Sequence, residues 1–176
     1  MIILGIDPGY AIVGYGVVEC SGASFRLLAC GAVTTAADMP FNKRLKVIYD
    51  DMTQIVGQYR PDEMSIEKLF FNSNEKTAID VAQARGVTLL PAIQRDIPIF
   101  EYTPLQVKSS IVGYGRAEKN QVQEMVRNML HLKNIIKPDD TADAVAIAIT
   151  HGLSLGRRRL EQKNAKNAID LEMNNK

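Results

Sequence analysis

Three extended segments at the start of the chain constrain the fold more than any other feature. They are Ile2–Asp7, Ala11–Cys20 and Phe25–Thr34, and the links between them are short and rich in residues typical of turns. Strands joined so closely in sequence usually pair as antiparallel neighbours. The sequence therefore predicts a three-stranded antiparallel meander at the N-terminus.

Helices and strands alternate in the rest of the chain. The spacing of apolar residues predicts helices over Pro40–Tyr59, Lys76–Arg95, Leu105–Val112, Val122–Leu130 and Asp140–Leu155, with strands at Glu63–Glu67 and Ile97–Tyr102. Pro91 lies inside the second helix, where we expect a kink or break. The predicted fold class is α/β, with a mixed five-stranded sheet flanked by helices.

Length and composition fit one soluble domain. The chain has 176 residues, 46% of them hydrophobic and 23% charged. We expect a folded domain over residues 1–156 and a polar, flexible tail over residues 157–176. The net charge of +1 neither indicates nor excludes a nucleic-acid partner. No apolar run is long enough for a signal peptide or a membrane span, which favours a cytoplasmic protein with no membrane partner.

Four acidic residues occupy positions typical of an active site. Asp7 and Glu67 each end a predicted strand, and active sites of α/β sheets gather at the carboxyl ends of strands. Asp140 and Asp143 open an apolar helix at a spacing that places them on one face. Each acid also has a structural interpretation, because Asp before Pro-Gly can start a turn and acids at a helix start can cap it.

Convergence of the four would favour function over structure. Two carboxylates about 5 Å apart repel by roughly 3 kcal/mol at an effective dielectric of 20, so a cluster persists only with raised pKa values or bound cations. The oxygen-only donor set selects Mg²⁺, with Mn²⁺ as a substitute. Two such ions can activate a water and stabilise the leaving oxygen of a phosphodiester.

Two further features point toward DNA. Lys119 lies near a helix start, where it is either an ordinary surface lysine or a phosphate contact. Phe70 and Phe71 follow Glu67 and lead into a polar stretch, so one of them is expected in the core and the other exposed, able to stack on a base. Motifs for a covalent nucleophile or a P-loop are missing from the sequence.

With these residues assembled, the chain resembles the bacterial RuvC family of Holliday-junction endonucleases. The resemblance runs from Met1 to about Gly156. It is carried by GIDPG, SIEKLF and QARG, by EYTPLQVKSSIVGYGRAEKNQV, and by DDTADAVAIAITH. Pro91 and the Asn/Lys-rich tail depart from the family pattern.

The resemblance implies a ribonuclease H-like fold and a homodimer that cuts opposed strands of a four-way DNA junction, with Mg²⁺, during recombination and repair. It implies 5′-phosphate and 3′-hydroxyl ends and work alongside the RuvAB branch-migration complex. By this resemblance Asp7, Glu67, Asp140 and Asp143 are the catalytic, metal-binding acids, with two ions per site. Lys108 and Lys119 match basic residues near the DNA, and Phe70 matches the aromatic residue at the junction.

Two other functions deserve weighing. Gly-Ile-Asp-x-Gly also occurs in actin-like and sugar-kinase ATPases, but these need a second comparable domain that 176 residues cannot supply. A non-catalytic junction-binding protein is the other alternative, and the presence of all four acids argues against it.

Overall fold

The computed structural model describes the backbone of residues 1–69 and 75–174, and the side chains within residues 1–69 and 77–156. Its elements follow the predicted order. The strands are β1 (Ile2–Asp7), β2 (Ile12–Ser21), β3 (Ser24–Thr34), β4 (Glu63–Glu67) and β5 (Ile99–Tyr102). The helices are α1 (Phe41–Tyr59), α2 (Glu75–Ile93), α3 (Pro104–Val112), α4 (Lys119–Met129) and α5 (Asp139–Asn174).

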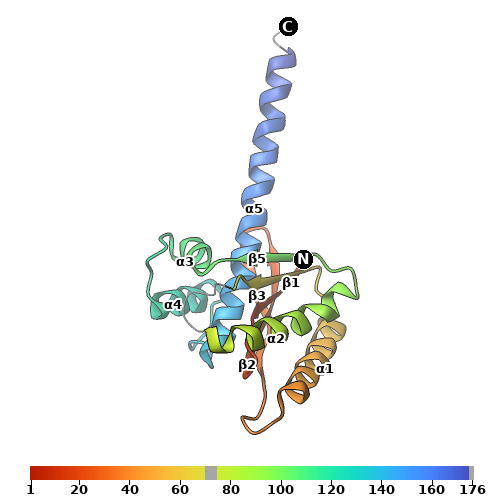
Figure 1. The fold of residues 1–176 in the computed structure, drawn as a ribbon. Coiled ribbons are helices and arrows are strands. Elements are labelled where there is room, and N and C mark those ends of the chain that lie inside the picture. The colour runs from red at the N-terminus through yellow and green to blue at the C-terminus, as the bar shows by residue number, and fades with distance from the viewer. Residues whose placement is uncertain (70–74, 175–176) are drawn as a thin grey trace.

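The strands form the predicted mixed sheet, in the order β3-β2-β1-β4-β5. Helices surround this sheet (Figure 1). β2 is antiparallel to both β1 and β3, whereas β4 is parallel to β1 and to β5. β1 is therefore central, with its carboxyl end beside that of β4. The meander turns at Gly22, whose positive φ of 63° suits a tight hairpin.

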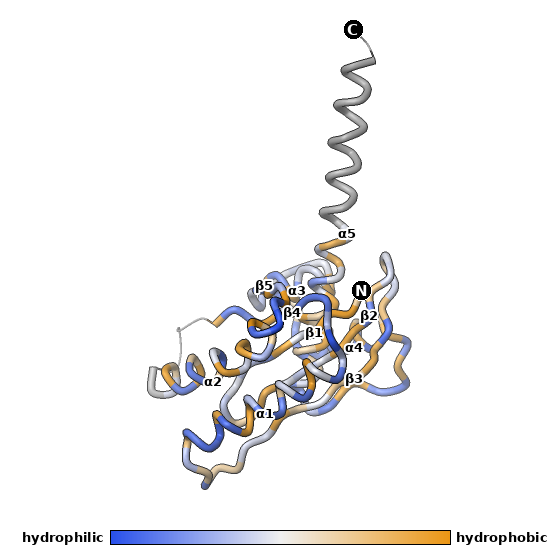
Figure 2. The backbone as a smooth tube through the Cα atoms, turned by 90° about the vertical axis from the view of Figure 1, so that its right-hand side faces the viewer, coloured by the Kyte–Doolittle hydropathy of each residue, from blue (hydrophilic) through white to orange (hydrophobic). Residues whose placement is uncertain are grey.

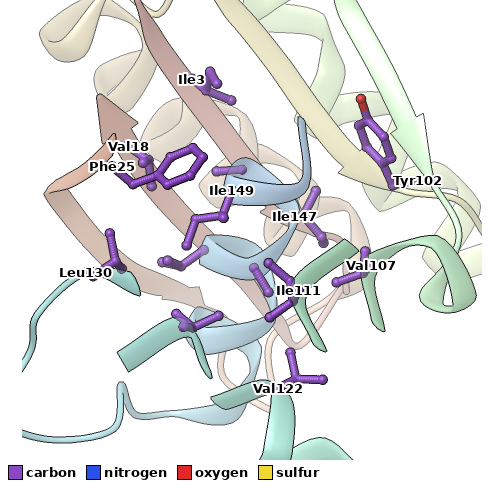
Figure 3. Close-up of a cluster of buried hydrophobic side chains, with 14 of the residues drawn as sticks. Ile3, Val18, Phe25, Tyr102, Val107, Ile111, Val122, Leu130, Ile147 and Ile149 are labelled. Atoms are coloured by element: carbon purple, nitrogen blue, oxygen red, sulfur yellow. The ribbon is translucent and has the colours of Figure 1, made fainter. Parts of the chain in front are cut away.

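Helices cover both faces of the sheet. Because side chains alternate along a strand, Leu4 and Ile6 pack with α1 and α2 on one face, and Ile3 packs with α3, α4 and α5 on the other. Figure 3 shows this second core, where Ile147 and Ile149 of α5 lie among side chains from the strands and from α3 and α4. Figure 2 shows hydrophobic and hydrophilic residues alternating along α1, as expected of a helix with one buried side.

Two helices test the sequence-based expectation. α2 passes Pro91 without a break and ends at Ile93, two residues before the predicted end, and the expected kink stays a prediction. α5 continues to Asn174 and projects beyond the sheet, so the predicted end near Leu155 is wrong. The polar residues after Leu155 include many good helix formers, which continue the helix without an apolar pattern to mark it. The domain boundary at residue 156 and the flexibility of the tail stay predictions. Within the described chain, no helix has the length and apolarity needed to cross a membrane.

Candidate active site

Asp7 and Glu67 lie side by side because their strands are parallel neighbours. Ile6 of β1 pairs in register with Ile66 of β4, and each is followed directly by the acid that ends its strand. Both strands are buried up to that point. The sheet therefore presents two carboxylates from rigid backbone at one edge, as predicted.

Glycines in the central strands bring the start of α5 to the same edge. Gly14 is the register partner of Asp7 in the β1–β2 pair, and a Cβ atom there would lie 2.1 Å from the backbone oxygen of Asp140. A Cβ at Gly5 would lie 2.1 Å from the backbone oxygen of Ala144. Only hydrogen at these positions lets the helix backbone rest on the sheet, which places Asp140 beside Asp7.

The turn after Asp7 is held from a neighbouring loop. The hydroxyl of Thr35 donates to the Tyr10 carbonyl at 2.7 Å, and the Thr35 amide donates to Ala11 at 2.9 Å. The buried Arg44 donates to backbone carbonyls of that loop and lies over the Tyr10 ring, 5.6 Å from its centroid. Sequence reasoning missed these residues, and also Gly14, although the alternation of glycines at positions 14 and 16 in β2 was a readable signal for close helix packing.

The four acids share an electrostatic environment. Burial raises the pKa of Asp7 to about 7, and the charges of Glu67, Asp143 and Asp140 add to this shift while Lys119 opposes it. Burial likewise raises the pKa of Glu67, with Asp143 adding and Lys119 opposing. The structure thus brings the predicted acids within range of mutual repulsion, which a positive charge relieves.

Lys119 begins α4 and supplies one such charge. Its ammonium Nζ lies 2.9 Å from Asp143 Oδ2 and 3.5 Å from Asp139 Oδ2. Burial lowers the pKa of Lys119, but the hydrogen bonds and charges of these two aspartates outweigh it and raise the pKa overall.

Asp139 has partners of its own besides Lys119. It accepts hydrogen bonds from Lys137 at 2.8 Å and from Gln123 at 3.2 Å. These two bonds, the Lys137 bond first, hold its pKa at about 2. Asp139 therefore belongs to an ion-pair network with Lys119 and Lys137.

A pocket of about 200 Å³ opens beside these side chains. The polar part of its lining comes from Glu67, Lys108, Lys119 and Asp143, and the apolar part from Pro104, Val107, Val122 and Ile147. Both predicted lysines therefore reach the same hollow as two of the predicted acids. A phosphate entering it would meet ammonium groups from α3 and α4.

The donor atoms of this site suit a divalent metal, but the side chains do not form a ready-made metal cage. The donors are carboxylates without His or Cys, which suits a hard cation, and the raised pKa values of Asp7 and Glu67 express a repulsion that a cation would remove. Among the described side chains, however, no three His, Cys, Asp or Glu residues stand close enough to form a cage. Asp143 instead faces the ammonium of Lys119.

The sequence also singles out two adjacent aromatic residues. Phe70 and Phe71 lie outside the described residues. His151 is buried, with Nδ1 2.7 Å from the Tyr102 hydroxyl and Nε2 bonded to Glu63.

Sequence comparison relates the chain to one family. The family model described as "Crossover junction endodeoxyribonuclease RuvC" matches residues 3–151. A protein of that name from Ruminiclostridium cellulolyticum is 58% identical over 154 residues, which make up 88% of this chain and 93% of that protein.

Solved structures agree with the sequence comparison. A Thermus thermophilus RuvC structure superposes with a TM-score of 0.81 at 36% identity, covering 87% of this chain and 94% of that one. T. thermophilus RuvC in complex with Holliday junction substrate gives 0.80 at 34% identity, with the same coverage. The predicted ribonuclease H-like fold is thereby confirmed.

Proposed function

This chain belongs to the RuvC family of crossover junction endodeoxyribonucleases, and we propose that it resolves four-way DNA junctions in recombination and repair. It does so by hydrolysing one phosphodiester in each of two opposed strands. The products are 5′-phosphate and 3′-hydroxyl ends that a ligase can join.

The single observation that carries this proposal is the meeting of carboxylates from β1, β4 and α5 at one edge of the sheet. Asp7, Glu67, Asp140 and Asp143 are the proposed catalytic residues. Asp7 and Glu67 are held by buried strands, and Asp140 by the close contact of α5 with Gly14. Rigid placement of this kind suits groups that must hold a reacting phosphate in one geometry.

The same four acids would hold Mg²⁺, for which Mn²⁺ would substitute, and we propose two ions per site. When bound, these ions supply Lewis-acid stabilisation to an attacking water and to the leaving oxygen of the phosphodiester. The protein contributes fixed carboxylates and an apolar wall of Val107, Val122 and Ile147 that limits water on one side.

Lys108 and Lys119 are the proposed contacts to the DNA backbone. They line the pocket next to Glu67 and Asp143, where ammonium groups can neutralise the phosphate beside the cut. Phe70, which follows Glu67 by three residues, is proposed to stack on a base at the junction, where each such contact contributes about 1–3 kcal/mol.

A homodimer is proposed because one junction needs two symmetric cuts. The outer side of α2 offers a matching surface: Ile79 is 69%, Leu90 41% and Ile93 54% exposed, at spacings that place them on one side of the helix. Gly86 lies on the same side, and a Cβ there would meet nothing within 4 Å. These features favour α2 over α1 as the dimer surface.

The remaining partners follow from the substrate. The RuvAB branch-migration complex is proposed to act on the same junctions, and the cytoplasm, where bacterial DNA lies, is the proposed location.

Cleavage of a synthetic four-way junction tests the proposal. The wild-type protein is expected to cut it symmetrically with Mg²⁺ and not with chelator. Asp7→Asn is expected to lose cleavage while it keeps junction binding, because the change removes a negative charge and no DNA contact. Linear duplex of the same sequence is the matched substrate control. Near-normal cutting by Asp7→Asn would remove Asp7 from the mechanism.

A further inference from the structure

Lys119 and the proposed metal ion compete for the same partner, the carboxylate of Asp143. Its ammonium pairs with Asp143 at 2.9 Å, and Asp143 is one of the acids assigned to the metal. A divalent cation that binds Asp143 would share this carboxylate with the ammonium of Lys119, which already contacts Oδ2. The two positive charges would also repel each other at that distance.

Asp139 and Asp143, the two partners of Lys119, would be left with different numbers of other partners if the lysine moved away. Asp139 keeps its bonds to Lys137 at 2.8 Å and to Gln123 at 3.2 Å. Asp143 has Lys119 as its ion-pair partner among the described residues. Departure of the lysine therefore leaves Asp143 uncompensated next to Asp7 and Glu67, and strengthens the attraction of the site for a cation.

The side chain of Lys119 can also reach a second partner, in the pocket beside it. It is half exposed and borders the pocket that Lys108 lines from α3. A backbone phosphate in this pocket offers both lysines a stronger partner than a shared surface carboxylate, since it brings charge and acceptor oxygens together.

We propose that Lys119 couples metal binding to DNA binding. Its ammonium holds Asp143 in the free protein and moves to a DNA phosphate when the junction binds, which releases Asp143 for the divalent cation. This inference rests on the proposed function. Its consequence is that the metal site becomes complete on the substrate rather than before it, so Lys119 contributes to substrate selectivity.

Measuring metal binding to the protein without DNA tests this inference independently of cleavage. Mn²⁺ is titrated into the free protein and followed by the electron paramagnetic resonance of unbound Mn²⁺. Lys119→Ala is expected to bind Mn²⁺ about tenfold more tightly than wild type. Lys137→Ala is the matched control, because it removes a cation bonded to Asp139 but not to Asp143, and it is expected to change the affinity less than twofold.

Thermodynamic linkage supplies the second readout. A four-way junction with uncleavable linkages, corrected for its own Mn²⁺ binding, is expected to raise the Mn²⁺ affinity of wild type about tenfold and that of Lys119→Ala less than twofold. Adding Asp143→Asn to Lys119→Ala should abolish the gain seen without DNA.

Equal Mn²⁺ affinities of wild type and Lys119→Ala in the free protein would overturn the coupling. An equal response of both proteins to the junction would overturn it as well. If the wild type still cuts junctions with Mg²⁺ in that case, the proposed function stands and only the role of Lys119 falls. Absence of both metal binding and cleavage in wild type would instead reject the proposed function.

Discussion

The ionised form of Asp7 destabilises the folded chain, because burial and three neighbouring acids raise its pKa from 3.8 to about 7. A carboxyl with a higher pKa in the folded than in the unfolded chain binds more protons when folded. Stability is therefore greatest below the unfolded pKa and falls as the pH rises from about 4 to about 7. The full loss is at most about 4 kcal/mol, from roughly three pKa units.

Thermal melting in chelator at pH 5 and pH 8 checks this sign. The wild type is expected to melt at a clearly lower temperature at pH 8, whereas Asp7→Asn should lose most of that difference. Asp38→Asn, which changes an exposed acid in the loop before α1, should behave as wild type. An unchanged pH dependence in Asp7→Asn would show that Asp7 does not carry the repulsion.

Lys108 makes a separate prediction about DNA. If its ammonium neutralises one phosphate, Lys108→Ala should make the slope of log affinity against log salt shallower by about one. Junction binding measured between 50 and 300 mM salt, at roughly constant pH, gives the slope. Arg26→Ala is the control, because Arg26 pairs with Glu19 on β2, outside the proposed site. A slope equal to that of wild type would show that Lys108 does not contact a DNA phosphate.

Single residues were predictable where the backbone alone decides their position. Asp7 and Glu67 could be assigned to one site because each ends a predicted strand, and active sites of α/β sheets gather at the carboxyl ends of strands. The pairing of Lys119 with Asp143 was not predictable, since it depends on how α4 packs against α5. No periodicity along either helix encodes that angle.

At the scale of elements, the position of α5 on the sheet decides the geometry of the site. Gly14 lies opposite Asp7 in β2, and its missing side chain leaves room for the backbone of Asp140. Any Cβ at Gly14 must push against helix backbone, which cannot rotate away as a side chain can. The start of α5 would then shift relative to Asp7.

Gly14→Ala is therefore expected to cost about 1–3 kcal/mol of stability through overpacking. Cleavage should fall about 100-fold, because a displacement near 1 Å at a catalytic group has an effect of that order. Gly156→Ala is the control within α5: its Cβ would meet nothing within 4 Å, so it should stabilise slightly and cut normally. Wild-type cleavage by Gly14→Ala would show that α5 is not positioned by this contact.

Elements were predictable in kind more than in extent. Each strand and helix was expected from hydrophobic spacing, and β4 was bounded correctly at Glu63 and Glu67. The end of α5 was placed too early, because the residues after Leu155 keep helix propensity after the apolar stripe ends. Pro91 lies in the last turn of α2. It cannot donate the backbone bond to the carbonyl four residues earlier, and the helix ends two residues after it.

At the scale of the whole molecule, one chain carries one set of carboxylates and a junction offers two equivalent strands. A two-fold symmetric homodimer, as proposed, would match the two-fold symmetry of the DNA. The exposed apolar side of α2 lies on the face of the sheet opposite α5, so pairing through it would leave both sets of acids open to DNA.

Mixed dimers test this arrangement directly. Wild-type subunits combined with an excess of Asp7→Asn subunits should give dimers that cut one strand and fail at the second, because each site reaches only its own strand. A supercoiled plasmid with an extruded cruciform reports the difference, since two cuts in one encounter give linear DNA and a single cut gives a nicked circle. The expected product of mixed dimers is the nicked circle, while wild-type dimers give linear DNA.

Wild type mixed with Asp38→Asn is the control for subunit exchange and should still linearise the plasmid. Efficient linearisation by the Asp7→Asn mixture would mean that one site serves both strands, and the requirement for a dimer would then lose its physical basis.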